Sequence, residues 1–343
     1  MSKLTEVVLE NVTAFAALHE TFSPGVNVII GTNGTGKTHL LKILYAACAV
    51  TMGEDKEKGF VRKLLAVFKP YESRITRLIR RRPGLTAADI TVRRDDGRAI
   101  TVAFGSRRGD RDEIRVDGEP QWQATAIEAA YIPVKEMLAN APGFLSTVAK
   151  RELQFEEIYP DILKRAYLPR LTGNDQDRTR LLKVLQTLIN GKVLIKGEYF
   201  FLKNNQGELE FTLLAEGLRK LALVWLLIQN GTLLAGSVLF WDEPEANLNP
   251  SLMGEVVDVI LELQRLGVQV FLTTHDYVLL KEFDLRKQPG DAMRYISMFR
   301  DPSGAVSANS GEAYTGIAPN AILDTFSDLY DRQLVRSLGG LKA

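Results

Sequence analysis

The sequence has almost no cysteine and no uninterrupted apolar segment long enough to cross a membrane. Cys48 is the only cysteine among 343 residues, which excludes a disulfide framework and makes a reducing cytoplasm the expected compartment. Met1 to Glu6 lack the apolar stretch of a secretory signal. Residues 221–241 are apolar, but turn residues at 229–232 interrupt them. We therefore expect a buried helix followed by a buried strand, and no membrane span.

Heptad repeats, internal repeats and low-complexity tracts are also absent from the sequence, which argues against a long coiled-coil arm. The hydrophobic and charged fractions, 45% and 25%, are those of an ordinary globular protein. We predict that residues 1–343 form a single domain with insertions.

A glycine-rich phosphate-binding loop is the most informative motif. Residues 31–38 read G-T-N-G-T-G-K-T, a complete G-x-x-x-x-G-K-[ST] pattern between an apolar strand and a helix. Its glycines allow positive φ, so that backbone N–H groups and the helix N-terminus can cradle phosphates. Lys37 adds a cation, and the Thr38 hydroxyl is placed to bind Mg²⁺. The residues expected to bind the nucleotide here are Gly31, Thr32, Asn33, Gly34, Thr35, Gly36, Lys37, Thr38 and His39.

A second motif supplies the acids that such a loop needs. Residues 237–241 form an apolar strand that leads into Asp242 and Glu243. Ligands of a parallel sheet bind at the carboxyl ends of its strands. Asp242 would hold Mg²⁺, directly or through water, together with Thr38. Glu243 would polarise the attacking water, a general-base task typically contributing about 10²–10⁴ in rate. The alternative is a solvated acidic turn after a core strand.

Four motifs together resemble the ABC class of P-loop ATPases. Residues 242–250, D-E-P-E-A-N-L-N-P, look like the run that joins the Mg²⁺-binding strand to the D-loop. Residues 272–276, L-T-T-H-D, look like the switch-histidine strand, and residues 214–220, L-A-E-G-L-R-K, lie where the signature is expected. The match is to the SMC/RecF/OLD-like branch, often labelled AAA-family ATPases, over roughly residues 4–50 and 210–300.

The resemblance implies an α/β fold, a P-loop NTPase with an ABC-type head, a β-rich first lobe and helical insertions. It also implies that ATP and Mg²⁺ are bound between two heads, in a homodimer or larger homo-oligomer. Lys37, Glu243 and His275 would act in catalysis within one chain. Gly217 would approach the γ-phosphate of the partner head, and Asn247 would lie near the seam. For His275 the alternative is a hydrogen-bonded histidine at a strand end.

Three positions leave alternatives open. The signature serine is replaced by Ala215, which is compatible with slow hydrolysis or with ATP acting mainly to hold two heads together. Glu136 lies in the segment where ABC proteins carry a glutamine, and is a candidate for a metal or water contact. Phe15 could pack near the adenine or be a core residue.

The rest of the chain is expected to add three segments to the head. Residues 53–84 read as a basic helical insert and residues 136–190 as a second helical insert, followed by a hairpin near 193–213. Residues 301–343 are expected to form a C-terminal strand and helical tail. The β-rich lobe should comprise strands near 4–12 and 25–30 and short strands within 89–133.

The net charge of +1 hides an uneven distribution. Between Arg62 and Arg82 there are eight basic residues and one acid, Glu72, and the bias continues at Arg93, Arg94, Arg107, Arg108 and Arg111. This patch could bind DNA phosphates, dock an acidic partner protein or be a solvated face. Aromatic residues are sparse in it, so base stacking is not indicated.

The interpretation is an ATP-binding and ATP-hydrolysing ABC-class ATPase whose nucleotide state regulates a separately encoded effector protein in anti-phage defence. A stand-alone head of this kind resembles the sensor ATPases of bacterial phage-defence systems. The alternatives are a DNA-binding head in repair or chromosome maintenance, and a scaffold that binds ATP without hydrolysing it.

Overall fold

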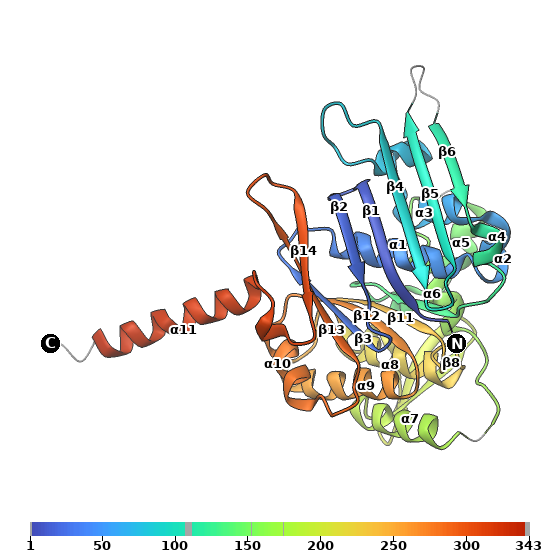
Figure 1. Cartoon of the computed structure of the whole chain (residues 1–343). Helices are drawn as coiled ribbons and strands as arrows, with labels where there is room; N and C mark the ends of the chain where they lie inside the picture. Colours follow the sequence, from blue (N-terminus) through green and yellow to red (C-terminus); the bar gives the residue numbers. More distant parts are fainter. Residues whose placement is uncertain (1, 107–111, 152, 174, 340–343) are drawn as a thin grey trace.

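A large mixed sheet forms the centre of the protein in the computed structural model, which describes residues 2–106, 112–151, 153–173 and 175–339 (Figure 1). Within these residues the sheet has 11 strands in the order β6-β5-β4-β1-β2-β14-β13-β3-β12-β11-β7. Its strands are β1 (Leu4–Val12), β2 (Phe15–Thr21), β3 (Val26–Gly31), β4 (Ala87–Arg94), β5 (Ala99–Ser106), β6 (Asp112–Asp117), β7 (Ala129–Ile132), β11 (Val238–Asp242), β12 (Gln269–Thr274), β13 (Met293–Arg300) and β14 (Val306–Gly311).

Helices cover the sheet and form parts of the two expected helical segments. The α-helices are α1 (Lys37–Ala49), α2 (Gly53–Lys58), α3 (Phe60–Phe68), α4 (Glu119–Trp122), α5 (Phe144–Lys150), α6 (Ile158–Ala166), α7 (Gln176–Leu188), α8 (Glu216–Gln229), α9 (Met253–Arg265), α10 (Tyr277–Arg286) and α11 (Ala321–Gly339). Residues 69–84 contain two short 3-10 turns rather than a continued helix.

One half of the sheet is parallel and the other antiparallel. Strands β7, β11, β12, β3 and β13 pair in parallel, so the ends of β3, β11 and β12 lie at one edge. The antiparallel half comprises β1, β2, β4, β5 and β6, and it meets the parallel half through β14. The expected α/β fold with a β-rich lobe is therefore correct.

The parallel strands are buried on both faces, as is usual where helices cover both sides. In β3, Val28 and Ile30 pack with residues of α8 and α9, whereas Ile29 packs on the opposite face with α1. In β11, Trp241 packs on the face covered by α8 and α9, and Phe240 packs on the opposite face with α1. Because both faces of these strands are packed, the strands cannot slide along their own axes. The residues that follow the strand ends are therefore held in place.

The apolar segment from residue 221 to 241 forms most of α8 and then β11, as expected. Among the described residues, no helix combines the length and apolar character that a membrane crossing needs.

Strand β14 (V-S-A-N-S-G) lies within residues 301–343, where a strand was expected, although it has one large apolar residue. Strand β2 was not expected after β1. The hairpin expected near 193–213 is present and is extended by a third strand, so that β8 (Lys192–Lys196), β9 (Tyr199–Asn204) and β10 (Gly207–Glu210) form a separate antiparallel sheet. All four residues of β10 are exposed, so its sequence shows no burial alternation.

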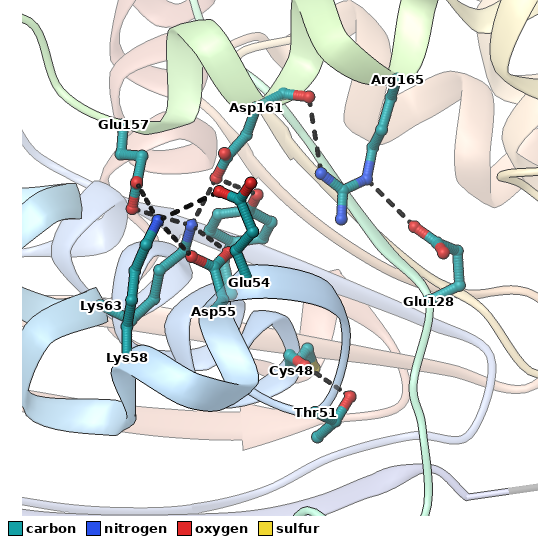
Figure 2. Close-up of polar contacts among 11 residues, drawn as sticks. Cys48, Thr51, Glu54, Asp55, Lys58, Lys63, Glu128, Glu157, Asp161 and Arg165 are labelled. Carbon is teal, nitrogen blue, oxygen red and sulfur yellow. Dashed lines mark hydrogen bonds and ion pairs between the residues drawn. The ribbon is translucent and has the colours of Figure 1, made fainter. Parts of the chain in front are cut away.

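A buried lysine joins the first helical segment to the second (Figure 2). Lys63 of α3 is 0% exposed, and its Nζ lies 2.6 Å from Asp55 Oδ2, 3.0 Å from Glu157 Oε2 and 2.6 Å from Asp161 Oδ2. Among the described residues these three carboxylates come close enough together to hold a metal ion. Lys63 already supplies the cation between them, and its charge is not available to a surface patch.

Removing this lysine should strongly destabilise the fold. Replacing Lys63 by Met leaves the buried Asp161 carboxylate without this counter-ion, so we expect Lys63→Met to lower the free energy of unfolding by about 3–5 kcal/mol. Urea unfolding of the variant and the wild type measures the difference. The matched control is Lys58→Met, because Lys58 contacts Asp55 and Glu157 at the surface and such pairs contribute about 0–1 kcal/mol. If both variants lost the same free energy of unfolding, the claim that the buried Lys63 stabilises the fold more than the surface Lys58 would be contradicted.

Candidate functional site

The loop between β3 and α1 has the backbone that phosphate binding requires. Gly31, Gly34 and Gly36 have φ of 144°, 75° and 90°. A Cβ at Gly36 would come within 2.7 Å of the Phe15 ring, and one at Gly31 within 2.2 Å of the Met298 carbonyl oxygen. Only glycine fits these positions. Phe15 is buried beneath the loop, so the core alternative is the correct one for this residue.

Lys37 lies folded against the same loop. Its Nζ donates to the carbonyl oxygens of Gly31 (2.8 Å) and Thr32 (3.1 Å). Burial lowers the pKa of Lys37, and the nearby carboxylates of Glu243 and Asp242 oppose that shift. The ammonium is thus a partly desolvated cation held by weak acceptors, which a phosphate could replace.

Asp242 gathers hydroxyl groups from three neighbouring elements. Its carboxylate accepts hydrogen bonds from Thr38 (3.0 and 3.2 Å), Thr273 (2.5 Å) and Tyr131 (3.2 Å). The carboxylate and the Thr38 hydroxyl are the hard oxygen donors that Mg²⁺ prefers, so this pair fits the expected metal site. Sequence reasoning missed Thr273 and Tyr131. Thr273 and Tyr131 lie at or near the carboxyl ends of β12 and β7, the two strands beside β11. A hydroxyl side chain at such a strand end was the sequence signal that could have identified them.

Glu243 and His275 meet across the ends of β11 and β12. His275 Nε2 lies 2.9 Å from Glu243 Oε1, and the Glu243 N–H donates to Thr273 Oγ1 at 3.1 Å. Both side chains line one hollow with the phosphate loop. The residues around this hollow are Asn33, Gly34, Gly36, Lys37, Thr38, His39, Glu243 and His275. The structure thus brings the predicted catalytic residues together, while their roles stay predictions.

Glu245 is an acid beside this site that sequence reasoning did not single out. Its Oε1 accepts hydrogen bonds from Thr274 Oγ1 (2.7 Å) and from the His275 N–H (2.9 Å). Its Oε2 is buried without a hydrogen-bond partner. Burial raises the pKa of Glu245 to about 7, and these hydrogen bonds only partly oppose the shift. The residue links the segment after Glu243 to the backbone of His275.

Gly217 lies at the start of α8 and does not line the hollow. A Cβ at Gly217 would come within 2.6 Å of the Asn247 carbonyl oxygen, so glycine here permits close packing within the same chain. Lys220, fully buried one turn later, donates to the carbonyl oxygens of Ala246 (3.0 Å) and Glu243 (3.4 Å). The signature helix is therefore tied to the segment that follows Asp242. A contact of Gly217 with a second head stays a prediction.

Glu136 forms an ion pair with Arg219 near the start of α8. Its Oε2 lies 2.7 Å from Arg219 Nε on α8, and its other oxygen accepts from the Leu138 N–H. Burial raises the pKa of Glu136, whereas Arg219 lowers it. In this structure the carboxylate is paired with α8, and a metal or water contact of Glu136 stays a prediction.

The basic segment 62–82 divides into parts with different environments. Arg77, Arg80 and Arg81 line a second hollow with Tyr71, and His39 lines both hollows. Arg300 also lines this second hollow, and its Nη2 donates to the Gly34 carbonyl oxygen at 2.8 Å. These arginines therefore lie beside the phosphate loop rather than on a separate face.

Of the arginines that continue the basic bias into the β-rich lobe, the structure describes Arg93 and Arg94. Arg94 is buried, with its guanidinium 3.7 Å from the centre of the Trp122 ring. Arg93 is exposed. Arg107, Arg108 and Arg111 lie outside the described residues.

Comparison with known proteins shows which family and which proteins this chain is similar to. Residues 26–281 match the family described as "AAA domain, putative AbiEii toxin, Type IV TA system". A 61-residue segment is 43% identical to the DNA replication and repair protein RecF of Lacticaseibacillus casei (strain BL23) and, equally, to that of Lacticaseibacillus paracasei (strain ATCC 334). This match spans 18% of the chain and 16% of each relative.

Two solved structures share the fold. An SMC head bound to the C-winged helix domain of ScpA has a TM-score of 0.58 at 14% identity, over 90% of this chain and 98% of that one. An Smc head with an extended coiled coil, bound to the C-terminal domain of ScpA derived from Pyrococcus furiosus, has a TM-score of 0.53 at 12% identity. That match covers 97% of this chain and 99% of the other. The expected ABC-type head is confirmed as a fold.

The raised pKa of Glu245 predicts a pH-dependent effect of its replacement. Its folded-state pKa of about 7 exceeds the usual 4.5, so its ionisation destabilises the folded state progressively as the pH rises through this range. Gln cannot ionise. In nucleotide-free protein, we expect the melting temperature of Glu245→Gln minus that of the wild type to be larger at pH 8 than at pH 5. A difference that is the same at every pH would contradict the shifted pKa.

Proposed function

The chain belongs to the AAA domain family that its residues 26–281 match, and from that premise we propose that it binds and hydrolyses ATP at the hollow of the phosphate loop. The observation that supports this best is the convergence of Thr38, Asp242, Glu243 and His275 at the ends of adjacent parallel strands. A phosphate loop, a candidate metal-binding acid and a candidate base lie at one site.

Each residue has a task that its geometry supports. Lys37 would exchange its loop carbonyls for phosphate oxygens, and the free N–H groups at the start of α1 would bind the same phosphates. Bound Mg²⁺ would neutralise charge on the β- and γ-phosphates. Glu243 would accept the proton of the attacking water, and His275, at 2.9 Å, would hold that carboxylate in place.

The second hollow offers a place for the nucleoside. It adjoins the phosphate loop through His39 and presents the exposed ring of Tyr71, over which Arg77 lies at 5.4 Å. Aromatic and guanidinium groups are suited to stacking on a base. In this proposal Arg77, Arg80 and Arg81 act on the nucleotide, which reduces the share of the basic segment left to bind DNA or an acidic protein.

The proposed ATP-bound state is a pair of heads, in a homodimer or larger homo-oligomer. The start of α8 would face the second nucleotide through backbone N–H groups and the positive helix end. Ala215 offers no hydroxyl there, which favours slow turnover. A scaffold that binds ATP without hydrolysis is the second candidate, supported by this residue alone.

The proposed pathway is control of a separately encoded effector in anti-phage defence. The family description, which names a toxin and a type IV toxin–antitoxin system, supports it. A DNA-repair head is the competing pathway, supported by the short RecF match.

Removing the proposed base separates hydrolysis from ATP-dependent assembly. Glu243→Gln keeps the side-chain shape beside His275 but cannot accept the proton, so the rate of ATP hydrolysis should fall by about 10²–10⁴. Because the bridging nucleotide is no longer consumed, the variant with Mg-ATP should form a larger or longer-lived oligomer than the wild type. Light scattering after size exclusion measures this.

The matched control is Glu208→Gln, an acid on the separate small sheet, which should leave hydrolysis and assembly unchanged. An unchanged hydrolysis rate in Glu243→Gln would exclude Glu243 as the base. If the wild type and Glu243→Gln are equally inert and equally assembled, the scaffold alternative is favoured.

A further inference from the structure

The backbone of Glu243 has a conformation that its surroundings must enforce. Its φ is 50°, in the left-handed region that residues other than glycine rarely adopt. Pro244 follows it, and the residue before a proline favours an extended backbone instead. The proposed base therefore lies at a strained position. Such strain persists only where neighbouring groups hold the residue in place.

Hydrogen bonds reach Glu243 from β12, from α8 and from its own turn. On the side of β12, Thr273 Oγ1 accepts the Glu243 N–H at 3.1 Å, and His275 Nε2 lies 2.9 Å from the carboxylate. The Ala246 N–H closes a turn by donating to the Glu243 carbonyl oxygen at 3.1 Å. Lys220 Nζ of α8 donates to the same oxygen at 3.4 Å. Lys220 is thus the contact that fixes this carbonyl from outside its own loop.

Lys220 is a buried cation whose hydrogen bonds go to backbone carbonyls. It is 0% exposed, and its Nζ donates to the oxygens of Ala246 (3.0 Å) and Glu243 (3.4 Å). Within the described part of the chain its ammonium forms no ion pair. Burial lowers the pKa of Lys220, and the carboxylate of Glu216 is the largest charge that opposes the shift. Burying an ammonium is costly, and an apolar side chain would fill the same space without that cost.

We propose that Lys220 is a positioning residue for hydrolysis, which keeps the Glu243 backbone left-handed and its carboxylate beside His275. The inference rests on the proposed function, in which Glu243 accepts the proton of the attacking water. Without the ammonium, the backbone before Pro244 relaxes toward the extended conformation that it favours. The carboxylate then turns away from the attacking water. A displacement of about 1 Å can reduce a rate about 10²-fold.

Replacing Lys220 by Met removes the ammonium and keeps an unbranched side chain in the core. We expect kcat for ATP hydrolysis by Lys220→Met to fall by about 10–10²-fold, because the base is misplaced. Affinity for a non-hydrolysable ATP analogue with Mg²⁺, measured by calorimetry, should change by less than about twofold, since the phosphate loop is untouched. Lys220→Gln keeps N–H donors on a shorter side chain and should lose less of the rate than Lys220→Met.

The matched control is Leu227→Ala, on the same face of α8 and about 10 Å further along the helix than Lys220. Leu227 is 0% exposed, so its replacement leaves a cavity that destabilises the core. Well below the melting temperatures of the variants, Leu227→Ala should hydrolyse ATP at the wild-type rate. An equal loss of kcat in Leu227→Ala and Lys220→Met would assign the effect to the stability of α8 and overturn the positioning role.

A double variant tests whether Lys220 acts through Glu243. The proposed base is absent from Glu243→Gln, so adding Lys220→Met should lower its residual rate by less than about twofold. A further loss as large as the one in the wild-type background would show that Lys220 acts independently of Glu243, and would contradict the proposal. A wild type that hydrolyses ATP no faster than Lys220→Met would also overturn it, while an active wild type leaves the proposed function standing.

The histidine NMR signals of nucleotide-free protein report the position of Glu243 independently of hydrolysis. The chain has three histidines, His19, His39 and His275. We expect Lys220→Met to shift the imidazole signals of His275 and to leave those of His19, on β2, unchanged. Unchanged His275 signals would overturn the proposal whether or not the wild type hydrolyses ATP. Shifted His275 signals in a protein without ATPase activity would support the hold of Lys220 on Glu243 and contradict the proposed function.

Discussion

The parallel register of β11 and β12 is the constraint on which the candidate site depends. It pairs Asp242 with Thr273, and the hydroxyl of Thr273 binds that carboxylate at 2.5 Å. Residues of β3 and β12 are paired in the same way, which brings the phosphate loop to the same edge. A shift by one residue would turn Asp242 toward the opposite face of the sheet. Double burial of these strands prevents such a shift, so core packing positions the acids.

The same acids are linked to the helix that is expected to face a second head. Lys220 binds the backbone after Asp242, Glu245 binds the backbone of His275, and Glu136 pairs with Arg219. A nucleotide that moves Glu243 would therefore act on α8 through hydrogen bonds and close packing at Gly217. In the proposed function, these contacts would connect the hollow to α8 even though Ala215 has no hydroxyl.

The motifs predicted the fold and much of the site because they are local. The phosphate loop needs glycines at fixed spacings, and an acid after an apolar strand marks the binding edge of a parallel sheet. Tyr131, Thr273 and Glu245 were missed because their function depends on which strands become neighbours. The pairing of Glu136 with Arg219 could not be predicted because the two residues lie far apart along the chain. The basic segment was treated as one patch, although Lys63 is buried and Arg77 lines a hollow.

The most direct test of the account is calorimetric titration of the protein with Mg-ATP. Lys37 donates to the loop carbonyls of Gly31 and Thr32, and in the account its cation turns to the phosphates when nucleotide binds. Wild-type protein should bind, Lys37→Ala should lose about 2–5 kcal/mol of binding free energy, and the exposed control Lys150→Ala should bind as wild type does. Equal affinity of wild type and Lys37→Ala, or no binding to the wild type, would contradict the account.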